Sequence, residues 1–385
     1  MEELLLHSNL LKEIQLRSDG DNHFGIYKGA VYKLGEITSK FIELLKIESI
    51  SKALEEVVQA YDLTEDECVY LINSLKRLVE SIEKPNSTRN YLKLSFTVFS
   101  SQVVNTITGK LTFFFKKGLV VFLGIMALAI HCYFFIKLSF NFSSGYSQLT
   151  YLDSFIIFTV VVFIALAHEL GHSVASLYFG VPPKEIGFGF YIFFPVLFSN
   201  VTEIWVLDKF KRIWVNLAGL YFQIIISIPL LLLLIIFNQS SFAPLFQYLV
   251  LINIFMMAYS IIPFIRNDGY WVISDLVEIS DLNKQANVIP VKVLMHRSLN
   301  NFNKWVVLYS FLSYFFIVYI ALSLISGLVD NIRYILTLQK NGSLLLWLQA
   351  HIPQVFSTLI SLFFITLLLR TFKNWIKLII VELRS

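Results

Sequence analysis

The segment SFIIFTVVVFIALAHELGHSVASLY, residues 154–178, decides the fold because it carries ionisable side chains inside a long apolar run. A helix of about 20 apolar residues crosses the hydrocarbon core of a bilayer, so the segment predicts a transmembrane helix. Ionisable groups are costly inside a membrane and usually serve a function there. The HELGH pattern at residues 168–172 is therefore the first candidate for a functional site.

The composition of the whole chain predicts a polytopic α-helical membrane protein. Of its 385 residues, 56% are apolar, 16% are aromatic and only 15% are charged, a mixture unlike that of soluble domains. The small net charge of +4 does not suggest nucleic acid as a partner, and Cys68 and Cys132 belong to no metal or redox spacing. About six transmembrane helices are expected, at residues 118–137, 154–178, 213–237, 246–265, 305–328 and 353–371.

The basic residues predict that both termini lie in the cytoplasm. Most of them fall in alternate loops, as the positive-inside rule requires; the segment 329–352 carries only Arg333 and Lys340, and Lys137 at the outer edge of the first span is an exception. The start of the chain, MEELLL, is acidic and has no positively charged segment before an apolar core, so no cleavable signal peptide is expected. The basic groups are Lys110, Lys116 and Lys117; Lys184, Lys209, Lys211 and Arg212; Lys284, Lys292, Arg297 and Lys304; and Arg370, Lys373, Lys377 and Arg384.

Residues 1–90 hold most of the dense charge and predict a small cytoplasmic α+β domain of winged-helix-like form. EIQLRS and HFGIYKGAVYKLG alternate apolar and polar residues, which predicts an antiparallel hairpin. Three helices with apolar faces follow, and Thr64 with Glu67 is a capping-box start for the third. Residues 91–117 are expected to form an amphipathic linker at the membrane surface, 118–275 a catalytic membrane core, and 276–385 the remaining transmembrane helices and a cytoplasmic tail.

The H-E-x-x-H pattern indicates a metal site, because four residues rotate a helix by about 400° and bring His168 and His172 to one face. Glu169 lies about 100° away and can reach a water at the metal as general base. Such a zinc site needs a third protein ligand. Asp268, between the helix breaker Pro263 and Gly269, is the candidate; an extended backbone is expected to turn its carboxylate toward one Zn²⁺ per chain.

HELGH in one span and P-x-x-x-x-D-G in a later one resemble the site-2 protease family of intramembrane zinc metallopeptidases. The resemblance covers about residues 118–275 and implies hydrolysis of a peptide bond in a bacterial cell membrane. The family pattern N-x-x-P-x-x-P-x-D-G has Ser260 in place of its Asn and Arg266 in place of its second Pro. Four polar residues remain candidates for substrate or transition-state contacts: Ser260, Asn253, Asn216 and Gln223.

The loop VPPKEIGFGFYIFFPVLFSNVTEIW, residues 181–205, is rich in aromatic and β-forming residues and predicts a hairpin against the membrane. Backbone at that depth must be satisfied by protein or by a water cavity, so the hairpin is expected over the metal. It either pairs with an extended substrate or is an interfacial loop without a substrate role.

The N-terminal region resembles the PqqD-like peptide-recognition domains, and the aspartate motif resembles the peptide-maturation members of the protease family. These resemblances imply maturation of a ribosomally made, modified or unmodified precursor peptide. A modifying enzyme or a peptide exporter is then an expected partner, together with membrane lipid. The alternatives are proteolysis of a membrane-tethered regulator and a non-catalytic scaffold or immunity protein.

Overall fold

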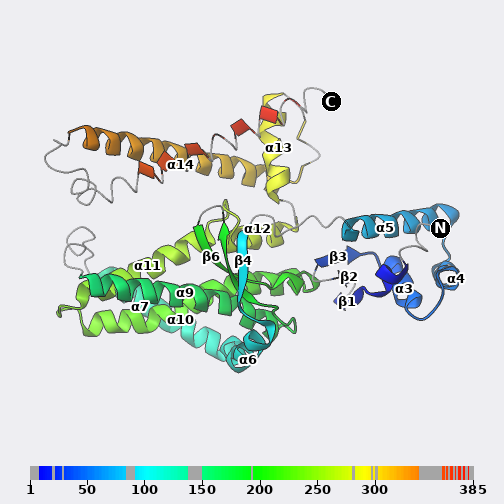
Figure 1. The fold of residues 1–385 in the computed structure, drawn as a ribbon, viewed down its shortest axis with the longest axis horizontal. Helices are drawn as coiled ribbons and strands as arrows, with labels where there is room; N and C mark the ends of the chain where they lie inside the picture. Colours follow the sequence, from blue (N-terminus) through cyan, green and yellow to red (C-terminus); the bar gives the residue numbers. More distant parts are fainter. Residues whose placement is uncertain are drawn as a thin grey trace. The chain divides into compact units, whose positions relative to one another are not determined.

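The computed structural model describes residues 8–19, 22–27, 30–83, 92–137, 150–191, 194–279, 282–295, 298–299 and 302–337, with scattered residues between 358 and 380. The chain divides into two compact units, Met1–Val272 and Ile273–Ser385. Figure 1 shows the order of the elements along the chain. The candidate ligands His168, His172 and Asp268 all belong to the first unit.

The first described elements of this unit are a short helix, α2 (Ser8–Lys12), and an antiparallel three-stranded sheet of order β1-β2-β3. The strands β1 (Gln15–Asp19), β2 (Asn22–Tyr27) and β3 (Ala30–Leu34) lie where the sequence predicts a hairpin, with one strand more than expected. The helices α3 (Glu36–Leu45), α4 (Ile50–Tyr61) and α5 (Glu65–Glu83) follow.

The apolar faces predicted for these helices form a core of their own. Phe41, Leu45, Val57, Leu71 and Leu75 are buried together in it. The capping box at the start of α5 is confirmed, because the Glu67 carboxylate accepts from the Thr64 backbone N–H at 2.9 Å and the Glu67 N–H donates to Thr64 Oγ1. The buried apolar side chains of this core all come from residues 11–82.

A second three-stranded sheet, of order β4-β5-β6, lies beside α9 (Figure 1). The strands β5 (Ile186–Tyr191) and β6 (Phe194–Ser199) confirm the hairpin predicted in residues 181–205. The strand β4 (Leu92–Phe99) was expected to be part of an amphipathic linker, but it pairs with β5. The sequence analysis did not foresee this strand, although LKLSFTVF alternates with the period of two that suits one. The helix α6 (Ser101–Leu111) and the turn η1 (Thr112–Phe115) follow β4.

Among the residues that the structure describes, five helices are long and apolar enough to cross a membrane, which makes the chain a multi-pass membrane protein by length and composition. They are α7 (Lys117–Lys137), α9 (Tyr151–Tyr178), α10 (Lys209–Ile236), α11 (Ala243–Ile261) and α14 (Lys304–Thr337). The helices match the first five predicted spans and extend most of them. The sixth predicted span, 353–371, lies largely outside the described residues.

In the first unit, α10 packs against α7, α9 and α11, and α9 also packs against α11. These four helices run alongside one another in Figure 1. The short 3-10 helix η2 (Thr202–Val206) joins the second sheet to α10 and contacts the first sheet, so that Phe24 and Ile26 share a core with Ile204. The second unit holds α13 (Leu282–Leu294) packed on α14, where the Ser310 hydroxyl donates to the Ala286 carbonyl at 2.7 Å.

Candidate metal centre

The candidate centre lies where α9 packs against α10, and on each helix the residues that contribute to it are four apart in sequence. On α9 the stripe holds His168 and His172, and on α10 it holds Val215, Gly219 and Gln223. Residues four apart lie on one face of a helix, one turn above the other. The packing of α9 on α10 therefore brings both imidazoles against three successive turns of α10.

The two histidines are held by hydrogen bonds from their Nδ1 atoms to α10. His172 Nδ1 lies 2.8 Å from the Val215 carbonyl oxygen, and His168 Nδ1 lies 3.0 Å from Gln223 Oε1. A carbonyl oxygen can only accept, so Nδ1 carries the proton in both contacts. The Nε2 atom of each neutral ring then presents a lone pair, which is the form in which histidine binds a metal.

Asp268 is brought to the histidines by a tight turn after α11. The helix ends at Ile261, before Pro263, because the residue preceding a proline avoids the helical conformation. Asp268 is the first residue of a short helix, α12 (Asp268–Val277), and the Asn267 side chain donates to the Tyr259 carbonyl across the turn. The backbone is extended only at Ile262, and residues 263–267 form turns and bends, so the extended backbone expected before Asp268 is wrong. Gly269 is required here, because a Cβ would collide with the carbonyl of Ile261.

Three ligand atoms converge in this place. The two Nε2 atoms are 3.1 Å apart, and Asp268 places Oδ2 2.9 Å from His168 Nε2 and Oδ1 3.4 Å from His172 Nε2. Asp268 Oδ2 is buried and accepts no hydrogen bond from the described residues, because the neighbouring His168 Nε2 lies at 2.9 Å without the angles of a hydrogen bond. Ligands about 2.0–2.1 Å from a tetrahedral zinc lie about 3.3 Å from one another. Two imidazole lone pairs and a carboxylate at these separations repel unless a cation lies among them, so the residues fit zinc.

Glu169 lies next to this group but is not one of the converging ligands. Its carboxylate accepts a hydrogen bond from the backbone of Ser199, at the end of β6, and interacts electrostatically with both histidines and with Asp268. The Ser199 hydroxyl also bonds the Ser173 hydroxyl on α9 at 2.6 Å. The hairpin thus ends against α9 beside Glu169, which leaves the carboxylate near the ligands without occupying a ligand position.

The four other polar candidates lie at different distances from the ligands. Gln223 contacts His168 directly, and buried Asn253 donates to the Gln223 backbone carbonyl at 3.1 Å, tying α11 to α10. The Ser260 hydroxyl donates to the Met257 carbonyl of its own helix. Asn216 follows Val215 on α10. A contact of any of the four with substrate or transition state stays a prediction, and the support that Gln223 gives to His168 was not foreseen.

Gly219 also lies at the centre, although the sequence analysis did not propose it as a site residue. A Cβ at this position would lie 2.6 Å from the Nε2 atoms of both His168 and His172. Only a glycine leaves the space in which the metal is expected. Gly219 is spaced by four residues from both Val215 and Gln223, so the three residues share one face of α10. This spacing indicates a role for Gly219 only when it is known that this face packs against the histidines.

Gly219→Ala is expected to lower zinc affinity about tenfold or more while leaving the helices folded, because the methyl group displaces the ligand atoms. The measurement is zinc per chain by mass spectrometry after dialysis against a graded chelator series. Gly124→Ala is the matched control, since a Cβ at this membrane-helix position meets no atom of the described residues within 4 Å. Equal zinc retention in both proteins would mean that the space beside Gly219 does not hold the metal.

No family model and no solved structure matches the chain. The chain is similar to a Bacillus subtilis protein named "Putative peptide zinc metalloprotease protein YydH", with 27% identity over 145 residues, or 37% of this chain and 56% of that protein. The chain thus spans about half the length of the curated relative that it matches. At this distance the similarity supports a metalloprotease relationship, in agreement with a centre whose ligands suit zinc.

Proposed function

We propose that the chain is an intramembrane zinc metalloprotease of the site-2 type, with one zinc held by His168, His172 and Asp268. The observation that carries the proposal is the convergence of two Nε2 lone pairs and one carboxylate, with atoms within 4.8 Å of one another, beside a second carboxylate that is not a ligand. Three protein ligands with a position left for water characterise catalytic zinc sites, whereas structural sites use four protein ligands.

Zinc, when bound, supplies Lewis acidity, which polarises a carbonyl and makes water a nucleophile near neutral pH. Glu169 takes the proton from the attacking water and delivers it to the leaving amine. Gln223 and the Val215 carbonyl hold the two imidazoles in the tautomer that ligation needs. With side-chain exposures of 9–21%, the three ligands lie inside the protein, where few waters compete with these contacts.

The substrate of the proposed enzyme is an extended peptide. A helix hides its carbonyls in its own hydrogen bonds, so the scissile segment must be unwound before attack. The edge strand β6, which ends at the contact between Ser199 and Glu169, offers backbone groups with which such a segment can pair. Together with the N-terminal sheet and helices, this favours maturation of a ribosomally made precursor peptide.

We also propose that both termini lie in the cytoplasm. A reporter protein fused after residue 290 is then expected to give a cytoplasmic signal, and an exterior signal would contradict the proposed orientation.

The experiment is co-expression of the chain with a small precursor peptide encoded beside its gene. Mass spectrometry is expected to detect a shortened peptide, and the purified protein should produce the same fragment only while zinc is bound. Removal of the metal with a chelator should stop cleavage, and added zinc should restore it. A precursor that stays intact with zinc-loaded protein, beside release of a membrane-tethered regulator, would replace the maturation proposal by regulated proteolysis.

A further inference from the structure

The short helix η2 contacts both the N-terminal sheet and the helix α12. Its residues Ile204 and Val206 are buried in the same core cluster as Phe24 and Ile26 of β2. Three residues make one turn of a 3-10 helix, so the intervening Trp205 points in a different direction from both neighbours. Trp205 is only half-buried and lies outside that cluster. The helix therefore packs on the sheet with some side chains and keeps one for another contact.

Trp205 makes that contact with the first turn of α12, the helix that begins with Asp268. Its ring meets the ring of Trp271 edge to face, with the centroids 6.2 Å apart and the planes at 81°. The Arg212 guanidinium lies 5.2 Å from the centroid of the Trp205 ring and donates to the Leu207 carbonyl at 2.7 Å. Aromatic and cation–π contacts both depend on orientation, so the Trp205 ring has a defined position against α12.

The position of Asp268 depends on individual contacts of this first turn. The helix α12 does not pack broadly against any other helix or strand that the structure describes. The end of α11 holds the turn through the bond from the Asn267 side chain to the Tyr259 carbonyl. Trp271 lies three residues after Asp268, and residues three apart are neighbours on a helix. A shift of Trp271 is therefore expected to move the carboxylate as well.

The strand β2 divides its side chains between two cores. Phe24 and Ile26 belong to the cluster that contains Ile204, whereas a Cβ at Gly25 would collide with Ile14 of the N-terminal core. This is the alternation expected of a strand, whose successive side chains point to opposite faces of the sheet. A charged side chain at Ile26 would therefore be directed at the contact with η2 and not into the core of the N-terminal helices.

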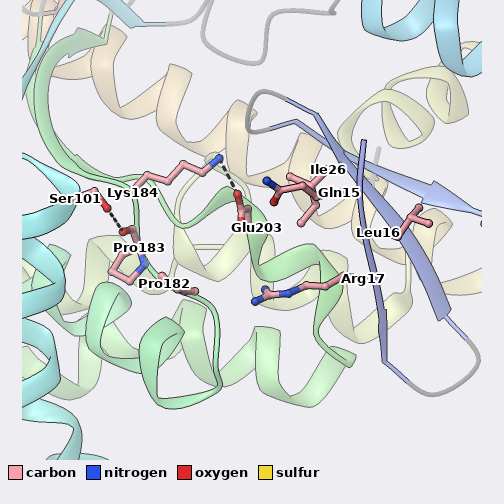
Figure 2. Close-up of a pocket in the computed structure, with 9 residues that line it drawn as sticks. All are labelled: Gln15, Leu16, Arg17, Ile26, Ser101, Pro182, Pro183, Lys184 and Glu203. Atoms are coloured by element: carbon pink, nitrogen blue, oxygen red, sulfur yellow. Dashed lines mark hydrogen bonds and ion pairs between the residues drawn. The ribbon is translucent and has the colours of Figure 1, made fainter. Parts of the chain in front are cut away.

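The contact between the N-terminal sheet and η2 is partly open. A pocket of about 350 Å³ lies there, and Figure 2 shows Ile26 of the sheet and Glu203 of η2 in its lining, with Glu203 paired to Lys184 at 2.9 Å. Beside it, the Arg17 guanidinium donates to the Gly180 carbonyl at 3.4 Å. Partly polar interfaces of this kind are typical of domains that can separate. A single charge at Ile26 is therefore expected to release the sheet from η2.

We propose that Trp205 is a positioning residue for Asp268, and that docking of the N-terminal sheet on η2 holds Trp205 against Trp271. This inference rests on the proposed protease function, because it takes Asp268 as a ligand of the zinc. Trp205 acts through the first turn of α12 and not as a ligand. The N-terminal domain then contributes to the metal centre by its docking, independently of any peptide.

The test measures metal binding by the full-length protein in nanodiscs, with zinc and cobalt(II) as probes. Trp205→Leu keeps an apolar side chain without the ring and is expected to weaken zinc binding about tenfold, as loss of an outer partner of a metal ligand does. Trp205→Phe keeps a ring at the contact and is expected to bind zinc within about twofold of the wild type. Trp305→Leu is the matched control, because this tryptophan is 53% exposed and belongs to α14.

Cobalt(II) distinguishes a displaced ligand from a loss of fold, because its visible spectrum depends on the geometry of its ligands. Trp205→Leu is expected to change the spectrum of the bound cobalt(II), and Trp205→Phe to restore it. A folding defect alone would lower the amount of bound metal and leave the spectrum of the remainder unchanged. An unchanged spectrum in Trp205→Leu would therefore contradict the positioning role.

Ile26→Asp tests the docking in a protein whose η2 is unchanged. It is expected to weaken zinc binding by a factor similar to that of Trp205→Leu, and the double variant should bind no more weakly than Trp205→Leu alone, because both changes act through one ring. Ile47→Asp is the control, with the same exchange at a side chain that is 82% exposed.

The proposal is overturned by equal affinities in Trp205→Leu and Trp305→Leu, by equal affinities in Ile26→Asp and Ile47→Asp, or by an additive loss in the double variant. A wild-type protein that binds no zinc would instead refute the proposed function. Metal binding is measured without substrate, so the two failures are distinguishable.

Discussion

The Glu169→Gln protein is expected to hold zinc at the wild-type level and to cleave its precursor about 10²–10⁴-fold more slowly. The amide keeps the shape of the side chain and can still meet the backbone of Ser199, but it cannot take a proton from water. Because Glu169 is not one of the three converging ligands, the metal should stay bound. Zinc per chain is measured by mass spectrometry, and cleavage by the rate at which the shortened peptide forms.

Asp153→Asn is the matched control for this change. It makes the same carboxylate-to-amide exchange in the same helix, at the capping box of the first turn of α9, about 24 Å along the helix from Glu169. It should cleave at the wild-type rate. A Glu169→Gln protein that matures its precursor as fast as the control would remove Glu169 from the chemistry and leave the scaffold or immunity interpretation as the better account.

The membrane helices could be predicted from the sequence because lipid imposes a simple requirement on each of them. A span must be apolar for about 20 residues, and this can be counted without knowledge of its neighbours. The errors lie at the ends: α10 begins at Lys209, four residues before the predicted span, because Asp208 caps it with its side chain accepting from two backbone N–H groups. Helix ends depend on local capping by side chains, and a count of apolar residues does not take capping into account.

The second sheet was predicted in part, because one of its strands comes from elsewhere in the chain. The β5–β6 hairpin pairs residues that are close in sequence, and its composition indicates it. The strand β4 pairs with β5 across more than 80 residues, as the bond from Thr97 Oγ1 to Glu185 Oε2 illustrates. The residues of β4 alternate between apolar and polar, but the sequence analysis assigned them to an amphipathic linker at the membrane surface. Pairing over such a separation depends on how the whole unit packs, so it cannot be predicted from the residues of β4 alone.

The convergence of the three proposed ligands could be predicted from the sequence, but the contacts around them could not. Helical spacing indicates His168 and His172, and a motif indicates Asp268, whereas the hydrogen bonds that orient the two imidazoles come from α10. Gln223 was considered for contact with substrate, yet it bonds His168. Which face of α10 meets α9 is decided by side-chain packing along both helices, and periodicity is weak in a helix that is apolar on all sides.

Removal of the carboxylate ligand is the second change with a large expected effect. Asp268→Ala is expected to lower zinc affinity by more than the roughly 10–100-fold that loss of an outer hydrogen-bond partner costs, and to abolish cleavage. Without the carboxylate, two neutral imidazoles remain, and they supply neither the third ligand nor the negative charge of the centre. Zinc is measured per chain after dialysis against a chelator, and cleavage with the precursor in excess zinc.

Arg266→Ala is the control, because this exposed side chain belongs to the same turn and lies two residues before the ligand. Circular dichroism should give the same helix content for both proteins, so that loss of zinc reflects the missing ligand and not a lost fold. The two substitutions are expected to differ: Glu169→Gln keeps the metal and loses cleavage, whereas Asp268→Ala loses both. Full zinc retention in Asp268→Ala would mean that the convergence of Asp268 on the two Nε2 atoms is an ion pair and that the third ligand lies elsewhere.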